Sequence, residues 1–284
     1  MNDPIGASRA FCRLLIFFAL TLIAMAVYRV SGLGRGQGSR PVAKFWFSAS
    51  SRLIGLQLVR SGLPVTEGPV LYLANHISYL DILLLGQQLD VTFVAKSEVR
   101  DWPLFGTLAE LGGTLFVSRR AASTRDEAAQ IRSRLAAGGR VILFPEGTSS
   151  DGTDVLPFKS ALLGLAQDIP GLRIQPVTIA YPHPSRAGVD LRPAWYGDMS
   201  LLPHLWQLLQ WRRGQAHLRF HPPLRLDQRQ IDRKRLAVAC QTQIRQGLHQ
   251  LCALPIGVPS ELHGQDAPGW PEAAPEAAFE QAVD

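Results

Sequence analysis

His76 and Asp81, five residues apart in the segment NHISYLD, are the side chains of this 284-residue chain best suited to proton transfer. They follow a short apolar run, Pro69–Ala74, that predicts a buried strand. Residues five apart do not share a helix face, so we expect His76 on the turn before a helix and Asp81 in its first turns, reaching back. A carboxylate that sets the tautomer of an imidazole makes it a general base. The alternative is that Ser78 and Asp81 only form a helix-capping box.

A second polar segment, FPEGTSS, follows the apolar strand predicted at Val141–Phe144. Its candidate substrate contacts are Gly147, Thr148 and Ser149, with Glu146 beside them at the end of the strand. Glycine permits close backbone approach, and the N–H groups and hydroxyls after it can bind an oxyanion. The alternative is an ordinary turn from strand to loop.

Two cations follow other predicted strands. Arg119 ends the segment GTLFVSR, and Lys96 follows Val91–Ala95. An arginine at a strand end can hold a phosphate through two parallel hydrogen bonds, and a lysine can add a further anion contact. For both residues the alternative is a solvated surface cation.

The elements that must position these side chains alternate between strands and helices. Short apolar, β-branched runs predict six strands: Pro69–Ala74, Val91–Ala95, Gly113–Val117, Val141–Phe144, Ile174–Tyr181 and Ala216–Phe220. Helices are predicted at Ser78–Gln88, Ser123–Ala137 and Ser160–Gln167. The alternation predicts an α/β fold with a mixed, mainly parallel sheet flanked by helices. Ligands in such sheets lie beyond the strand ends, where the polar segments fall.

The N-terminal sixty residues predict a membrane-attached helical segment. Leu14–Tyr28 holds no charge and would form a helix of ~22 Å, against the ~30 Å hydrocarbon thickness of a bilayer. A spanning anchor, an interfacial helix and a cleaved signal peptide are all compatible with it. Val42–Arg60 predicts a second, interfacial helix, with a core-packing helix as the equal alternative. Leu201–Trp211 is a third apolar segment, able either to touch membrane or to pack.

Charge is distributed unevenly along the chain. Residues 1–60 hold eight Lys or Arg and one acidic residue, whereas residues 255–284 hold six acidic residues and no Lys or Arg. We therefore predict a membrane anchor at 1–60, a catalytic domain at 61–254 and a disordered acidic tail at 255–284. A basic, apolar N-terminus points to a lipid bilayer and not to nucleic acid, for which no binding stripe is found. The three cysteines lack metal-ligand spacing and favour a reducing compartment.

In order along the chain, NHISYLD, GTLFVSR, FPEGTSS and IQPV resemble the hallmark segments of the glycerolipid acyltransferase family, from about Leu58 to Leu226. That family contains the 1-acylglycerol-3-phosphate acyltransferases. The resemblance implies that His76 deprotonates an acceptor hydroxyl, oriented by Asp81, for direct attack on an acyl thioester. It implies no covalent intermediate, metal or cofactor. It also implies acceptor contacts from the matching positions: Asn75, Gly113, Arg119, Glu146 and Gly147.

Two positions depart from the family pattern. Ser149 stands where the family often has arginine, and Ser160 stands where it usually has glycine. The resemblance implies a lysophospholipid acceptor, most simply 1-acyl-sn-glycerol-3-phosphate, with acyl carrier protein or coenzyme A thioester as donor. Loss of the arginine favours a non-phosphate acceptor, such as a lyso-ornithine lipid.

Two other kinds of function compete with acyl transfer. The same His–Asp pair could activate water in an esterase, and a membrane scaffold would need neither residue; the intact motifs argue against the scaffold. The basic residues after the first apolar segment, Arg35, Arg40 and Lys44, favour a catalytic domain on the cytoplasmic face, which for a bacterial protein means the inner membrane.

Overall fold

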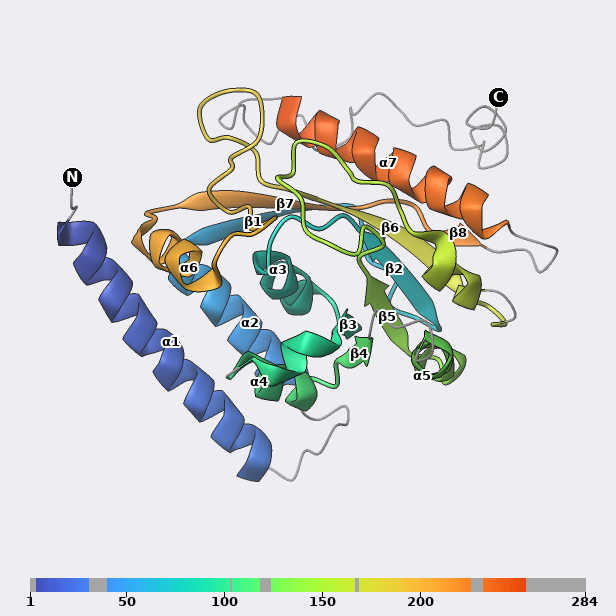
Figure 1. Ribbon diagram of the computed structural model, residues 1–284, viewed down its shortest axis with the longest axis horizontal. Helices are drawn as coiled ribbons and strands as arrows, with labels where there is room; N and C mark the ends of the chain where they lie inside the picture. Colours follow the sequence, from blue (N-terminus) through green and yellow to red (C-terminus); the bar gives the residue numbers. More distant parts are fainter. Residues whose placement is uncertain are drawn as a thin grey trace.

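The computed structural model describes residues 4–30, 40–102, 104–117, 124–166, 169–225 and 232–253, and is built around one mixed sheet (Figure 1). The strands are β1 Leu56–Ser61, β2 Val70–Ala74, β3 Thr92–Lys96, β4 Leu115–Val117, β5 Arg140–Leu143, β6 Arg173–Ala180, β7 Gly214–Phe220 and β8 Leu224–Arg225. The helices are α1 Pro4–Val30, α2 Arg40–Ile54, α3 Leu80–Gln88, α4 Phe105–Leu111, α5 Thr124–Ala136, α6 Leu201–Gln210 and α7 Arg233–Ala253, with 3-10 turns η2 Ser97–Asp101 and η3 Ser160–Ala166.

The strand order is β1-β7-β6-β2-β5-β3-β4, with β8 paired to β6. Strands β2, β3, β4, β5 and β6 run parallel to one another, β7 and β8 are antiparallel to β6, and β1 is parallel to β7. The prediction of a mixed, mainly parallel sheet is confirmed. Because β2, β3, β4 and β5 all point the same way, the segments that follow them leave the sheet at one edge.

Both faces of the sheet are covered, which explains why its strands read as continuous apolar runs. Along β2 the side chains alternate: Tyr72 packs toward α2, α3 and α6, whereas Leu71 and Leu73 pack toward α5 and α7. Figure 1 shows α7 on one side of the sheet and α2 and α3 on the other. The strand alternation therefore places α3, which carries Asp81, on the same side as the N-terminal helices.

Two predicted elements differ from the structure. The helix predicted over Val42–Arg60 ends at Ile54, and Leu56–Ser61 forms strand β1, so the sheet includes residues on both sides of the predicted boundary at residue 60. The break lies at Gly55, whose φ of 86° ends a helix without steric strain. Of the helix predicted over Ser160–Gln167, the described residues Ser160–Ala166 form a 3-10 turn, and α7 is an additional helix that the sequence pattern did not predict. The acidic tail lies outside the described residues.

Helix α1 lies against the domain along its length. In the part of the chain that the structure describes, it is the one helix long and apolar enough to cross a membrane. Trp46 Nε1 donates to Thr21 Oγ1 at 3.0 Å, and the Tyr28 hydroxyl donates to the Leu111 carbonyl. The Arg13 guanidinium donates to carbonyls at the ends of two helices, Ile54 of α2 and Leu209 of α6. A cation stabilises these carbonyls because they lack helical partners and carry the negative end of the helix dipole.

We predict that Gly55→Ala lowers the free energy of unfolding by more than the cost of placing alanine in a left-handed backbone conformation. A Cβ at position 55 would lie 2.6 Å from the Arg212 backbone oxygen, which cannot move aside without disturbing β7. The left-handed conformation adds about 1–2 kcal/mol for any residue with a Cβ. Gly171→Ala is the control, since it has a similar φ of 70° and nothing within 4 Å. Equal losses in melting temperature for the two variants would contradict the prediction.

Candidate active site

The turn between β2 and α3 brings His76 and Asp81 together. His76 Nδ1 lies 2.8 Å from Asp81 Oδ2. Helix α3 begins at Leu80, so His76 is off the helix and the Asp81 side chain reaches back from its first turn. The geometric expectation for this pair is confirmed.

Asp81 is completely buried and accepts four hydrogen bonds. Besides the imidazole, Oδ2 accepts from the backbone N–H groups of Ile77 at 2.7 Å and Ser78 at 3.0 Å, and Oδ1 accepts from the Tyr181 hydroxyl at 2.7 Å. Four donors fit an ionised carboxylate. Nδ1 of His76 is then protonated, and Nε2 keeps the lone pair that a general base needs. Only half of the predicted capping box forms: Asp81 accepts from the Ser78 N–H, whereas the Ser78 hydroxyl accepts from the Leu80 N–H.

Neighbouring groups fix the position of His76. Its ring stacks on Phe144, with centroids 4.2 Å apart, and its side chain is 22% exposed. Its backbone N–H donates to Glu146 Oε1 at 2.7 Å, and its carbonyl accepts from the Ser150 N–H at 2.9 Å. The loop after β5 thus holds the catalytic turn at both backbone groups, while the imidazole remains accessible.

Glu146 acts as a clamp between two segments. It is 2% exposed, and its second oxygen, Oε2, accepts from the Leu156 N–H at 3.0 Å. Burial raises the pKa of Glu146 to about 7. The sequence predicted a substrate contact here, but both oxygens are directed at backbone N–H groups. The geometry therefore gives Glu146 a positioning role on His76.

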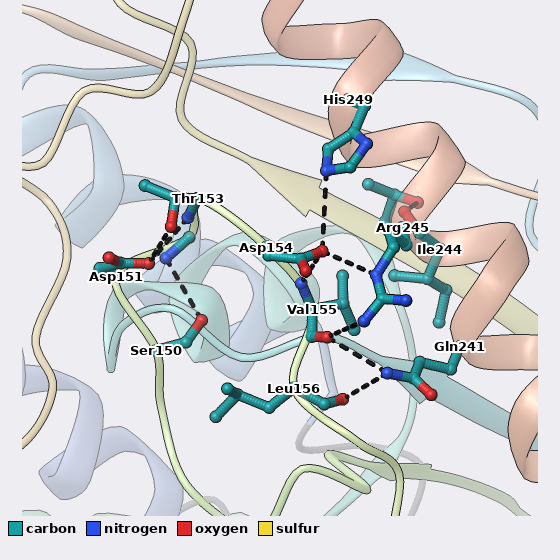
Figure 2. A network of polar contacts seen from close by, with 12 residues as sticks. Ser150, Asp151, Thr153, Asp154, Val155, Leu156, Gln241, Ile244, Arg245 and His249 are labelled. Atoms are coloured by element: carbon teal, nitrogen blue, oxygen red, sulfur yellow. Dashed lines mark hydrogen bonds and ion pairs between the residues drawn. The ribbon is translucent and has the colours of Figure 1, made fainter.

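The loop that Glu146 holds is anchored from the far side by α7 (Figure 2). Arg245 Nε donates to Asp154 Oδ1 at 2.7 Å, and Gln241 Nε2 donates to the carbonyls of Val155 and Leu156. Leu156 therefore connects α7 to Glu146 through its two backbone groups. This chain of contacts fixes the loop that supports the His76 backbone.

Lys159 lies over the loop predicted to contact substrate. Gly147 has a φ of 70°, and a Cβ there would lie 2.7 Å from Lys159 Nζ. Thr148 is exposed and Ser149 is half-buried. The ammonium group thus provides a cation beside Gly147, two residues before Ser149.

The remaining predicted site residues lie in different parts of the fold. The Asn75 amide is buried and bonded at both ends to the backbone of Ile179, at 2.9 and 2.7 Å, so it ties the end of β2 to β6. Lys96 is the exposed last residue of β3. Gly113 ends α4 in a left-handed conformation, with a φ of 72°. Arg119 lies outside the described residues.

Sequence reasoning missed two residues that the tertiary structure adds. Tyr181 follows β6, a hundred positions from the carboxylate that it bonds, and no local pattern signals this pairing. Lys159 directly precedes Ser160, which stands where the family usually has glycine, but no motif assigns Lys159 a contact. Among the described residues, no three His, Cys, Asp or Glu side chains are grouped so that they could hold a metal.

Comparisons with known proteins place these features in a family context. A family model described as Acyltransferase matches residues 52–180. The lyso-ornithine lipid O-acyltransferase of Brucella abortus is 36% identical over 252 residues, covering 85% of this chain and 94% of that protein. The 1-acyl-sn-glycerol-3-phosphate acyltransferase of Neisseria gonorrhoeae is 34% identical, covering 56% and 62%.

A solved structure shares the fold. The crystal structure of the 1-acyl-sn-glycerophosphate acyltransferase PlsC from Thermotoga maritima matches with a TM-score of 0.59. The match covers 86% of this chain and 97% of that one, at 21% sequence identity. At this identity the likeness supports the architecture alone.

The raised pKa of Glu146 predicts a pH-dependent stability. The folded state holds its proton up to about pH 7 and the unfolded state only to about 4.5, so the free energy of unfolding falls as pH rises through that window. We expect the wild type to lose roughly 3 kcal/mol relative to Glu146→Gln between pH 4 and 8. Urea unfolding at a series of pH values measures this difference. Parallel pH profiles would contradict it.

Tyr181→Phe tests the fourth donor to Asp81. Removing a hydrogen bond to a buried charge lowers the free energy of unfolding by about 1.5–3 kcal/mol. It should also lower kcat, with KM unchanged, for any reaction that uses His76 as a base. Tyr72→Phe is the matched control, because that buried hydroxyl donates to the Val65 carbonyl instead. A kcat loss that is equal in both variants would assign Tyr181 a purely structural role.

Proposed function

Because this chain belongs to the acyltransferase family, we propose that it transfers a fatty acyl group from an acyl thioester to the free hydroxyl of a lyso-lipid. The observation that carries the proposal is the His76–Asp81 pair. Its 2.8 Å contact, the buried carboxylate and the partly exposed imidazole form a positioned general base.

In the proposed reaction, His76 Nε2 takes the proton of the acceptor hydroxyl as its oxygen attacks the thioester carbonyl. Asp81 stabilises the imidazolium that forms. The tetrahedral intermediate then collapses and the carbon–sulfur bond breaks. The leaving thiolate takes the proton from His76, giving an ester and a free thiol. The proposal needs no covalent acyl-enzyme, and it uses no metal or cofactor.

The oxyanion that forms on the thioester carbonyl and the head group of the acceptor need positive partners near His76. Thr148 and the backbone N–H groups of its loop are proposed to stabilise the tetrahedral oxyanion. Lys159, Lys96 and Arg119 are proposed to contact the anionic parts of the two substrates. Lys159 is the best supported of these cations, since its ammonium group lies beside Gly147.

Of the two acceptors considered from the sequence, a lyso-ornithine lipid is proposed first and 1-acyl-sn-glycerol-3-phosphate second. Ser149 in place of arginine supports this order, as does the relative from Brucella abortus, which this chain matches over 94% of that protein's length. The donor is proposed to be an acyl thioester of acyl carrier protein or coenzyme A.

The substrates and helix α1 support a site of action at a membrane. Nine large apolar side chains on α1 are exposed: Ile5, Phe11, Leu15, Ile16, Phe18, Leu22, Ile23, Val27 and Val30. Burying a face of this kind in lipid removes apolar surface from water. We propose that the catalytic domain lies on the cytoplasmic face, as Arg35, Arg40 and Lys44 suggest.

The test is acyl transfer by the purified protein to a panel of lyso-lipids with both thioester donors. The release of free thiol and the formation of the acylated lipid are measured. We expect a lyso-ornithine lipid to be the best acceptor. His76→Ala should reduce transfer by about 10²–10⁴-fold, the usual contribution of a general base. His183→Ala, a histidine outside the site, should not.

Two outcomes would contradict the proposal. Full transfer by His76→Ala would remove the proposed base. Thiol release that is equally fast without any acceptor, and yields free fatty acid, would identify an esterase instead.

A further inference from the structure

Helix α6 has one buried and one exposed face, and large apolar side chains lie on both. His204, Leu208 and Leu209 face the core. Leu202 is 75% exposed and Trp206 is 39% exposed. The two exposed residues are four positions apart and therefore lie on one side of the helix. The helix has no charged residue, so this exposed Leu–Trp pair is suited to contact with an apolar partner.

The C-terminal end of α6 is hydrogen-bonded to α1. Arg9 of α1 donates to the Gln210 carbonyl at 2.8 Å, and Arg13 donates to the Leu209 and Trp211 carbonyls. Figure 1 shows α6 beside the N-terminal half of α1. Trp206 precedes Gln210 by four residues, so it lies ~6 Å along the helix axis from this contact. A bilayer that takes up the exposed side of α1 is thus within reach of Trp206.

The residues that flank α6 match the polar boundary of a bilayer. Tyr196 and Met199, just before the helix, are 38% and 39% exposed. Arg212 and Arg213, just after it, are exposed. Tryptophan and tyrosine favour the membrane–water boundary, and arginine can pair with lipid phosphates from there. A helix that faces only water or protein does not need aromatic and basic side chains at its two ends.

We propose that the Leu202–Trp206 face of α6 is a second membrane-contacting surface, seated in the headgroup region of the bilayer beside α1. The proposal rests on the membrane attachment of α1 in the proposed function and adds to it a contact about 200 residues later in the chain.

This contact would link the bilayer to the catalytic turn. His204 lies on the buried face of α6. Its Nδ1 is 3.0 Å from the Tyr79 hydroxyl, and its Nε2 is 3.1 Å from the Arg192 carbonyl. Because the carbonyl can only accept, Nε2 carries the proton and Nδ1 accepts from Tyr79. Tyr79 lies between His76 and Asp81, so one hydrogen bond joins the lipid-facing helix to the site. The two contacts would then fix the distance and the orientation of the active site relative to the bilayer that holds the acceptor.

The experiment places an environment-sensitive fluorophore at position 202, through Leu202→Cys in a Cys12→Ser background, in the full chain. Cys240 and Cys252 are buried and should not react. Vesicles of phosphatidylethanolamine and phosphatidylglycerol, with and without brominated acyl chains, supply the bilayer. We expect a shift of emission to shorter wavelength and quenching by bromine.

Two controls bracket the result. The native Cys12, exposed on α1, reports the attachment of that helix. Val238→Cys on α7, where Val238 is 49% exposed on the other side of the sheet, should remain in water. Quenching at positions 12 and 202 but not at 238 would support the proposal.

The remaining outcomes overturn it. Quenching at position 12 alone would leave α6 in water and refute the α6 contact, while keeping the membrane attachment of α1. No quenching at either position would refute both. A blue shift at position 202 that needs no vesicles and grows with protein concentration would mean that a second copy of the chain covers this face.

Discussion

The buried carboxylate of Asp81 is the interaction on which the rest of the site depends. An ionised carboxylate without partners would be very unfavourable in an apolar interior, so its burial requires donors on every side. Two come from the backbone of its own turn, one from His76 and one from Tyr181. Satisfying the charge therefore shapes the turn, sets the imidazole tautomer and joins β2 to the end of β6. The group that stabilises the fold locally also prepares the base.

The parallel strands explain why distant loops support this turn. Strands β2 and β5 are neighbours and end at the same edge, so the loop after β5 lies beside His76. Glu146 and Ser150 bind the two backbone groups of His76, and α7 holds the other end of that loop through Leu156. Each support is a backbone or buried contact. A shift in the loop would therefore move the imidazole as well.

The same sheet places the site near the N-terminal helices. Alternation along β2 sends one set of side chains toward α2, α3 and α6, and α1 packs on α2 and α6 through Arg13 and Thr21. The helix with the largest exposed apolar face is thus mechanically joined to the helix that carries Asp81. This arrangement suits an enzyme whose acceptor and product are lipids, because the distance from bilayer to base is set by packed helices and not by a linker.

The sequence by itself determined six of the eight strands, the α/β class, the His76–Asp81 geometry and the family, because each depends on local periodicity or on short motifs with a set spacing. It did not determine β1, because the sequence of Leu56–Ser61 is equally compatible with a helix. Pairing with β7 in the folded sheet makes this segment a strand. Nor could it separate substrate contacts from supports. Glu146 and Asn75 lie in catalytic-looking motifs, yet their polar atoms are taken up by the backbones of His76, Leu156 and Ile179. Only the tertiary structure decided these roles and added Tyr181, because a hydrogen bond between residues a hundred positions apart depends on strand order, which no local pattern records. It also added Lys159, because the loop after β5 folds back and brings the ammonium group over Gly147.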